Sequence, residues 1–505
     1  MTAVSTPESQ ATHCSGLVPL VALGVVSAAI YGAAFTLSWP LAEYVAQPQA
    51  DYAWFGRYTT ASQLSYLGAF LALFLLQYAA YRLVRAKPGG ISLDVIVAGQ
   101  IGFGLLNLWI YPVAALDLYD YLLYGRIVLV HGGNPFFQPP SAFVDPLVAY
   151  SPWPNERSVY GPVWQLLSLL PTAAAGDNLL RGILAFKLVG LAAFVGCTAV
   201  IWRLLLRLAP AYAAAGTLLF AWNPLLQFEL VGNGHNDVMM VLFVLLAVWA
   251  LVANRRLLVF PLLALAVLTK LLAVALGPVM LYGLLRGSRP LRAKLIAVGG
   301  GGLMSLGLAV ALYAPFWGGL DTLYFLSRGN WFTASIPTML REFLRQWLAY
   351  EDAGRFAATL VALGYALFTA FRLWLLWREE RRPDANPSDW QPWLRAAYDL
   401  TFVYLTFATL WWQPWYLVWL VALAALLPNR VVHERVLLFC YGATLNYLVF
   451  KYIWPTFQPM TYTTIMGLSV VMIFGLPLLH LALTIEWPRG LRRVPLAAAE
   501  PSAAT

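Results

Sequence analysis

The feature that most constrains this chain is its series of long apolar runs. A transmembrane helix needs roughly 20 mostly apolar residues, and many stretches of the 505-residue chain meet or approach that length. Apolar residues make up 61% of the chain and charged residues 11%, against about 45–50% and about 25% in soluble globular proteins. This composition excludes an ordinary soluble enzyme and a disordered chain, and it predicts a polytopic membrane protein.

We predict an all-α membrane protein with about fourteen transmembrane helices, or at least about twelve, each close to the length of a bilayer crossing. The predicted spans are 16–38, 62–83, 91–114, 183–201, 211–228, 237–253, 257–270, 272–285, 295–314, 355–377, 396–412, 415–427, 432–452 and 462–484. The pairs 257–270/272–285 and 396–412/415–427 contain members shorter than a full crossing. A single transmembrane domain over 1–485 and a tail over 486–505 account for the chain.

The basic residues predict the orientation of this domain. The net charge is +9, from 32 basic and 23 acidic residues, and 21 of the 32 basic residues fall in one set of mostly short loops. Basic residues of short loops remain in the cytoplasm, so both termini are predicted to be cytoplasmic. The two longest loops, 115–182 and 315–354, then lie outside. The positive charge is a topology signal and does not indicate nucleic-acid binding.

The first long outer loop opens with an acidic and aromatic segment. Apolar side chains recur there at three- and four-residue steps over 116–130, which predicts an amphipathic helix on the membrane surface. Asp117 and Asp120 are three residues apart and share one face of that helix, and Arg126 follows about two turns later. Two carboxylates near a guanidinium suit deprotonation of a hydroxyl beside an anionic group. Acids that only stabilise the helix dipole are the alternative interpretation.

A second polar group lies in the turn between two predicted spans. Glu229, His235, Asn236 and Asp237 fall there within nine residues of sequence. Asp237 has an alternative role as a helix N-cap, but capping does not account for Glu229 and His235, which are costly in a lipid-facing turn. No second His or Cys stands at ligand spacing, so no zinc site is predicted. We expect these side chains to bind substrate.

A lysine and two tryptophans complete the candidates. Lys270 has apolar neighbours on both sides and falls at the outer junction of two short helices. A cation inside the membrane indicates a functional site, and a phosphate suits it, although snorkelling to the interface is an alternative. Trp412 and Trp415 fit either an interfacial aromatic belt or stacking on a sugar. The 315–354 loop predicts a second amphipathic surface helix.

Nearly all of these polar candidates fall at the outer face of the predicted bundle. Transporters instead place their sites near the bilayer centre, on broken helices within repeated halves. The distribution therefore favours an enzyme that works at the outer leaflet.

Several motifs in this part of the chain match a known family. They are D-L-Y-D-Y at 117–121, G-R at 125–126, G-G-N-P-F at 132–136, V-Y-G-P at 159–162, N-G-H-N-D at 233–237, and L-T-K at 268–270 followed by a proline. Over about 110–280 the chain resembles the GT-C superfamily of polytopic glycosyltransferases. Within it, the chain is most similar to the polyprenol-phosphomannose-dependent α-mannosyltransferases of the bacterial α-1,6 type.

This resemblance implies an inverting sugar transfer, with mannose expected, from a polyprenyl-phosphate donor to a glycan or glycolipid acceptor. An aspartate is the implied general base, and the choice between Asp117 and Asp120 stays open, with a lean toward Asp117. The acidic pair leaves the need for a divalent cation open. A transporter or flippase of lipid-linked sugars, and a non-catalytic scaffold, are the competing hypotheses. The other implied roles are neutralisation of the leaving phosphate by Lys270 and Arg126, binding of sugar or acceptor hydroxyls by His235 and Asp237, and shaping of the pocket by Tyr160.

Overall fold

The computed structural model describes residues 7–47, 59–88 and 90–485, so the predicted cytoplasmic tail at 486–505 lies outside the described residues. The described residues are mostly helical, and their β-pairing is limited to two isolated bridges, one between Pro40 and Ile110 and one between Thr333 and Trp411. This confirms the prediction of an all-α architecture.

The described residues contain seven helices that are long and apolar enough to cross a membrane, or eight spans if one bent pair is counted as one. The seven are Gly16–Thr36, Thr60–Ala86, Leu179–Leu208, Leu291–Phe316, Tyr350–Glu380, Arg430–Thr456 and Tyr462–Thr484. The shorter apolar helices are Leu93–Leu108, Pro210–Ala221, Arg256–Thr269, Leu271–Leu285 and Pro414–Ala425. A multi-pass membrane protein is thus supported, while the predicted count of about fourteen spans is not confirmed.

The main helices follow one another closely along the chain. They are α1 (Pro7–Ile30), α2 (Leu41–Tyr44), α4 (Thr60–Ala86), α5 (Leu93–Leu108), α6 (Asp117–Leu129), α7 (Pro162–Ala175), α8 (Leu179–Leu208), α9 (Ala213–Ala221), α11 (Asp237–Val252), α12 (Val259–Thr269), α13 (Gly277–Leu285), α15 (Gly301–Tyr313), α16 (Ile336–Leu344), α17 (Tyr350–Glu380), α18 (Gln391–Val403), α19 (Leu417–Ala425), α20 (Arg430–Leu448) and α22 (Tyr462–Thr484).

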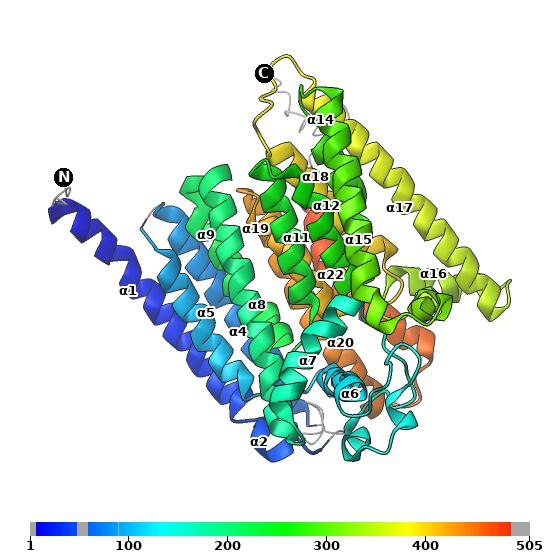
Figure 1. Ribbon diagram of the computed structural model, residues 1–505. Coiled ribbons are helices and arrows are strands. Elements are labelled where there is room, and N and C mark those ends of the chain that lie inside the picture. Colours follow the sequence, from blue (N-terminus) through cyan, green and yellow to red (C-terminus); the bar gives the residue numbers. More distant parts are fainter. Residues whose placement is uncertain (1–6, 48–58, 89, 486–505) are drawn as a thin grey trace, which may run out of the picture.

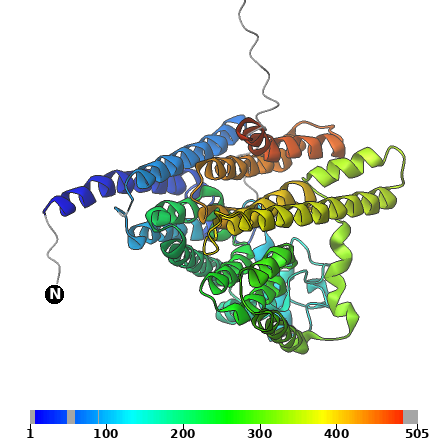
Figure 2. The same cartoon turned by 90° about the horizontal axis from the view of Figure 1, so that it is seen from above.

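The helices form a bundle whose two ends differ. In Figure 1, α6 and α16 lie at the lower end, and the first residues of α1 lie at the upper end. Polar contacts join the end of α4, the start of α20 and the end of α22: Tyr81 Oη lies 2.7 Å from His433 Nδ1, and Arg435 donates to Thr484 Oγ1 at 3.0 Å. Figure 2 shows the long α17 (yellow) running alongside α18. The long loops and the short basic loops therefore occupy opposite ends.

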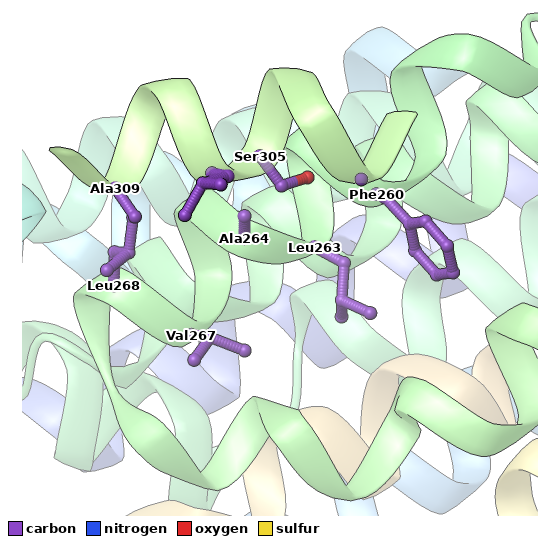
Figure 3. Close-up of a pocket in the computed structure, with 9 residues that line it drawn as sticks. Phe260, Leu263, Ala264, Val267, Leu268, Ser305 and Ala309 are labelled. Atoms are coloured by element: carbon purple, nitrogen blue, oxygen red, sulfur yellow. The ribbon is translucent and has the colours of Figure 1, made fainter. Parts of the chain in front are cut away.

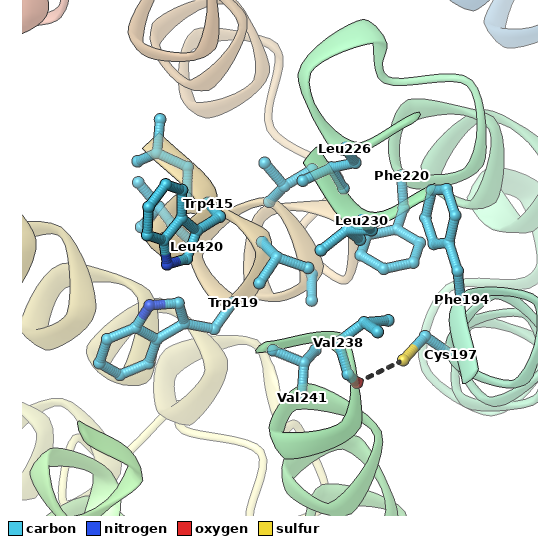
Figure 4. Packing of buried hydrophobic residues seen from close by; sticks show 14 of the residues in the cluster. Phe194, Cys197, Phe220, Leu226, Leu230, Val238, Val241, Trp415, Trp419 and Leu420 are labelled. Atoms are coloured by element: carbon cyan, nitrogen blue, oxygen red, sulfur yellow. Dashed lines mark hydrogen bonds between the residues drawn. The ribbon is translucent and has the colours of Figure 1, made fainter. Parts of the chain in front are cut away.

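The centre of the bundle is an apolar core shared by α8, α9, α11 and α19 (Figure 4). Phe194 and Cys197 from α8 meet Phe220 from α9 and Val238 from α11, and all four are buried. In a bilayer the lipid tails are as apolar as these side chains, so close packing between helices, more than exclusion of water, stabilises the contacts. This rigid core holds the irregular segment that follows α9.

The segment between α9 and α11 is a broken helix. Its two parts, Pro224–Gly232 and Asp237–Val252, are bent by 118°. Gly234 makes the bend with φ +74°, and a Cβ on it would lie 2.5 Å from Leu118 Cδ2. Glycine is the one residue that adopts this φ without strain and permits the close approach. The break therefore brings residues 233–237 directly against the first turn of α6.

The two predicted surface helices differ in the structure. α6 forms where the sequence predicts a helix, but all of 118–127 is buried, so the prediction that it lies on the surface is wrong. The rest of the 115–182 loop covers it, and Tyr124 Oη donates to the carbonyl of Glu156 at 3.0 Å. α16 retains an exposed apolar face at Phe343, as expected of an amphipathic surface helix. Periodicity alone does not distinguish a membrane surface from an overlying loop.

Candidate active site

Five titratable side chains from separate segments meet at the N-terminal end of α6. They are Asp117 from α6, Glu229 and His235 from the broken helix, Asp237 from the start of α11, and Lys270 from the end of α12. We call this group the Asp117 cluster. The sequence predicted all five as site residues, and the structure brings them together.

His235 is the central member of the Asp117 cluster. Its Nδ1 lies 3.7 Å from Asp117 Oδ2, and its Nε2 lies 3.3 Å from Glu229 Oε2. The imidazole also stacks on Trp415, with ring centroids 3.6 Å apart and planes inclined by 18°. The side chains of His235 and Glu229 are 0% exposed, while that of Asp117 is 20% exposed. Asp117 is thus the member of this chain of three groups that a substrate can reach.

Lys270 forms the second half of the cluster. Its Nζ lies 2.7 Å from Asp237 Oδ2 and 4.9 Å from the centroid of the Tyr416 ring. Lys270 has extended backbone angles, φ −153° and ψ 125°, which end α12 at Thr269. The side chain of Lys270 keeps some exposed surface, whereas Asp237 has almost none. A partly exposed cation beside Asp117 is suited to an anionic ligand.

The 115–182 loop packs against the segment that ends in Lys270. The backbone N–H of Gly161 donates to the carbonyl of Thr269 at 3.2 Å. A Cβ at Gly161 would lie 2.0 Å from the carbonyl oxygen of Leu268, so the close approach requires a glycine here. The adjacent Tyr160 donates its hydroxyl to Asp117 Oδ2 at 3.3 Å. Tyr160 therefore contacts Asp117 directly.

Burial controls the protonation of Asp117. Removal from water raises its pKa, and the charge of Lys270 and the hydrogen bond from Tyr160 only partly oppose that rise. Burial also raises the pKa of Tyr160 well above its ordinary value, so that its hydroxyl stays protonated as a donor. A carboxylate with a raised pKa is a stronger base, which favours proton abstraction by Asp117 at neutral pH.

Asp120 lies one helical turn further on and has different partners. It is buried and accepts a hydrogen bond from the Ser151 hydroxyl. Burial raises its pKa to about 8, with the Asp117 charge adding to the rise and the Ser151 hydrogen bond opposing it. Asp120 is therefore protonated at neutral pH and faces the covering loop. The two acids share a helix face in sequence but not an environment.

Arg126 lies apart from the Asp117 cluster. Nine residues of helix separate it from Asp117, about 13 Å along the axis. It donates to Asp145 Oδ2 and to Asp177 Oδ1, both at 2.8 Å, and His131 Nε2 lies 2.8 Å from the same oxygen of Asp145. Burial raises the pKa of Asp145, but hydrogen bonds from Arg126 and His131 outweigh it and leave that pKa below its ordinary value. We call these four residues the Arg126 network. Its contacts hold Arg126 away from the Asp117 cluster.

The remaining predicted residues divide between the site and the core. Trp415 lies in the cluster through its stacking on His235. Trp412 is fully buried and stacks on Phe439, with centroids 6.1 Å apart, so the structure places it in helix packing and not in the cluster. Asn236 is buried, and within the described part of the chain its side-chain nitrogen and oxygen have no hydrogen-bond partner. Buried polar atoms of this kind cost free energy, which substrate hydroxyls would offset.

Two contributors to the cluster were not predicted. Asn233 donates its amide to Glu229 Oε2 at 3.1 Å and accepts from the backbone N–H of Ala114 at 3.3 Å. It belongs to the same N-G-H-N-D motif as His235, so the motif contained a signal for it. Tyr416, under Lys270, follows Trp415 in an aromatic segment and carries no local signal of its role.

Lys187 is a buried lysine with a structural role. It contacts the backbone carbonyls of Asn107 (3.4 Å), Leu108 (3.3 Å) and Ile110. These carbonyls lie at and just beyond the C-terminal end of α5, where the helix dipole is negative.

Within the described ranges, no group of three or more His, Cys, Asp or Glu side chains is arranged to hold a metal ion.

Comparison with known proteins places the chain in a family. The family model described as alpha-(1->6)-mannopyranosyltransferase, N-terminal domain, matches residues 21–286, more than half of the chain. The chain belongs to this family. The match contains every titratable member of the Asp117 cluster, whereas Trp415 and Tyr416 lie beyond it. It confirms the resemblance found in the sequence motifs.

Two curated relatives carry the same description. Alpha-(1->6)-mannopyranosyltransferase A of Mycobacterium tuberculosis is 28% identical over 346 residues, which are 62% of this chain and 61% of the relative. Alpha-(1->6)-mannopyranosyltransferase A of Corynebacterium glutamicum is 28% identical over 138 residues, 26% of each chain. The chain therefore matches about six tenths of the first relative's length. No solved structure matches the chain.

Proposed function

We propose that this protein is a mannosyltransferase that works at the outer face of its membrane. It moves mannose from a polyprenyl-phosphate donor to a hydroxyl of a lipid-linked or cell-envelope glycan. Membership of the alpha-(1->6)-mannopyranosyltransferase family supports the sugar and the reaction class. The transporter and flippase alternative gains no support from the family or from the site. Within the site, the observation that carries the proposal is the partly exposed Asp117 carboxylate beside the Lys270 cation.

Asp117 is the proposed general base. The acceptor O–H bond breaks as its oxygen attacks the anomeric carbon, and the proton passes to the Asp117 carboxylate. The bond from the anomeric carbon to the phosphate oxygen breaks on the opposite side, and its electron pair leaves with the phosphate, so the configuration inverts. The burial of Asp120 and its raised pKa, about 8, argue against it in this role. The raised pKa of Asp117 and its exposure favour it.

Lys270 is the proposed electrostatic support for the leaving phosphate. A charged donor fixed near the leaving group stabilises the negative charge that develops there. Arg126 was expected to share this task, but its two carboxylate partners occupy it. We therefore assign it no part in the reaction.

An apolar pocket next to Lys270 supports a lipid-linked donor. The pocket, of about 360 Å³, lies between α12 and α15 (Figure 3). Its lining includes Leu268, two residues before Lys270, together with Phe260, Val267 and Leu306. An apolar hollow on membrane-facing helices beside a phosphate-binding cation suits a hydrocarbon chain that carries a phosphate.

The test is sugar transfer by purified protein in lipid nanodiscs, with radiolabelled polyprenyl-phosphate mannose and an oligomannoside acceptor. Asp117→Asn is expected to reduce the turnover rate by about 10²–10⁴-fold, the usual contribution of a general base, without loss of folding. Asp120→Asn, the matched control on the same helix, is expected to retain most of the activity. Full activity of Asp117→Asn would refute the assignment. The same assay with and without a chelator decides whether a divalent cation takes part.

A further inference from the structure

The contacts behind Asp117 indicate a role for His235 and Glu229 that neither substrate binding nor helix capping explains. Both side chains are fully buried, so neither has surface with which to meet a sugar. His235 lies between two carboxyl groups, one on each ring nitrogen. In the described part of the chain neither nitrogen forms a hydrogen bond of normal geometry. The three groups lie in line, from the accessible Asp117 to the buried Glu229.

A second buried histidine shows what a structural imidazole looks like in this protein. His433 Nε2 lies 2.6 Å from the carbonyl of Leu427, and its Nδ1 lies 2.7 Å from Tyr81 Oη. Its ring also stacks on Tyr212. Every polar atom of His433 has a short, neutral partner that fixes the fold. His235 instead has longer contacts to two ionisable groups, as expected of groups that tighten only when substrate is bound.

The charge balance of the Asp117 cluster favours the uptake of a proton behind Asp117. Asp117, Glu229 and Asp237 supply three carboxyl groups, and Lys270 supplies one cation, which is paired with Asp237. Two charged carboxylates with one neutral imidazole between them carry a large desolvation cost. A proton that Glu229 takes up through His235 during the reaction removes most of that cost. The amide of Asn233, which donates to Glu229, keeps that carboxyl oriented toward the ring.

We propose that His235 and Glu229 form a proton relay behind Asp117, and this inference rests on the proposed function. When the acceptor O–H bond breaks, the proton passes to the Asp117 carboxylate and from it to Nδ1 of His235. Nε2 of His235 passes its own proton to the Glu229 carboxylate, so the imidazole becomes neutral again and Glu229 carries the proton. After the products leave, the proton returns through Asp117 to water. His235 and Glu229 are thus positioning residues that act through Asp117.

Other ionisable groups act on the relay and enter its pH dependence. They are Lys270 and Asp237 beside His235 and Asp117, Asp120 on α6, Tyr160 on the covering loop, and Tyr447 of α20 beside Glu229. The variants are therefore chosen to change the relay and leave these groups in place.

The first experiment compares pH profiles of sugar transfer in nanodiscs. Glu229→Gln keeps the size of the side chain and an oxygen for Asn233 but cannot take up a proton. It is expected to lower kcat about 10²-fold with an unchanged KM for the acceptor, and to shift the acidic limb of the kcat profile. His433→Asn, which removes the structural histidine, is the matched control and is expected to retain the wild-type pH profile. A wild-type kcat and pH profile for Glu229→Gln would overturn the relay.

The second experiment does not depend on transfer activity or on the folding of Glu229→Gln. Infrared spectroscopy of protein labelled with ¹³C-carboxyl glutamate detects protonated glutamate through its C=O stretch. We expect the band of a buried protonated glutamate to titrate with pH in the wild type and its titration to shift in Asp117→Asn, because His235 couples the two carboxyl groups. An identical titration of that band in the wild type and in Asp117→Asn would overturn the relay. Absence of mannosyl transfer by the wild type would refute the proposed function instead, and the infrared result would still decide the coupling.

Discussion

The two ends of α6 carry nearly the same set of side chains in two different states. At its C-terminal end, Arg126, His131, Asp145 and Asp177 form an ion network in which three contacts are each 2.8 Å long. At its N-terminal end, the Asp117 cluster also combines carboxyl groups, a histidine and a cation, but the contacts of its histidine are 3.3 and 3.7 Å long. The charged groups of the Arg126 network are therefore fully paired, whereas His235 of the Asp117 cluster has only long contacts.

This difference separates a structural site from a chemical one. The Arg126 network joins three parts of the 115–182 loop and favours an ionised Asp145, as the lowered pKa of Asp145 indicates. The Asp117 cluster retains buried polar atoms without partners at Asn236 and a raised pKa at Asp117, features that cluster at functional sites. Residue types alone predict both groups equally well. The strength of the contacts tells them apart.

The largest expected effect is a loss of stability when the Arg126 network, at the C-terminal end of α6, is broken. Arg126→Ala removes the charged partner of the buried Asp145 carboxylate and leaves it only His131 among side chains. An uncompensated buried charge of this kind typically costs about 3–5 kcal/mol. We expect a marked loss of thermal stability, measured by fluorescence-detected unfolding in detergent, with the turnover of the remaining folded protein close to that of the wild type.

The double variant Arg126→Ala with Asp145→Asn is the control for this comparison. Removing the charge of Asp145 together with its partner is expected to recover part of the stability, because the neutral amide is cheaper to bury than a carboxylate. A turnover rate that falls far below that of the wild type in folded Arg126→Ala would contradict the division between the two ends of α6.

An intermediate effect, on the turnover rate, is expected when the charge of Lys270 in the Asp117 cluster is removed. Lys270→Gln removes the charge proposed to stabilise the leaving phosphate, and we expect the turnover rate to fall about 10²-fold, which corresponds to about 2.7 kcal/mol. The measurement is kcat for mannosyl transfer with saturating donor.

Lys270→Gln also leaves Asp237 buried without its ion-pair partner. The double variant Lys270→Gln with Asp237→Asn removes this complication, since it leaves neither charge behind. If the double variant regains stability but not activity, Lys270 acts on the substrate. Recovery of activity in the double variant would show that Lys270 only compensates Asp237.

The smallest expected effect concerns the pH dependence of stability through Asp120. Its pKa is 3.8 ordinarily and about 8 in the fold. Because the folded state binds this proton more tightly, the contribution of Asp120 to stability is complete below pH 3.8 and is lost as the pH rises toward 8. Asp120→Asn cannot ionise, so the melting temperature of this variant should fall less than that of the wild type between pH 5 and pH 8. Parallel curves for the two proteins would contradict the buried, protonated state of Asp120.

Local sequence carried the information for most of the candidate site. The five titratable residues of the Asp117 cluster are polar residues in apolar stretches of sequence. Because burying such residues in a membrane costs free energy, the sequence alone identified them as candidates. Gly161 and Gly234 lie inside the motifs that identified the family, and the structure shows both at close backbone approaches. The all-α architecture followed in the same way from apolar run lengths.

The rest depended on long-range contacts that no local pattern records. The apolar periodicity of 116–130 correctly predicted a helix. Its predicted place on the surface was wrong, because residues of the same loop cover the helix. Arg126 was expected at the site on helical spacing, but two acids, 19 and 51 residues further on, bind it instead. Trp412 and Trp415 are three residues apart, yet Trp412 packs on α20 and Trp415 stacks on His235.

The most direct test of the central claim is a side-by-side transfer assay of Asp117→Asn and Arg126→Lys, one conservative variant from each end of α6. Both proteins are purified in nanodiscs, checked for folding, and given polyprenyl-phosphate mannose and an oligomannoside acceptor. The account predicts that Asp117→Asn is folded and loses mannosyl transfer by at least about 10²-fold, while folded Arg126→Lys transfers mannose at close to the wild-type rate. Wild-type turnover in Asp117→Asn, or loss of turnover confined to folded Arg126→Lys, would contradict it.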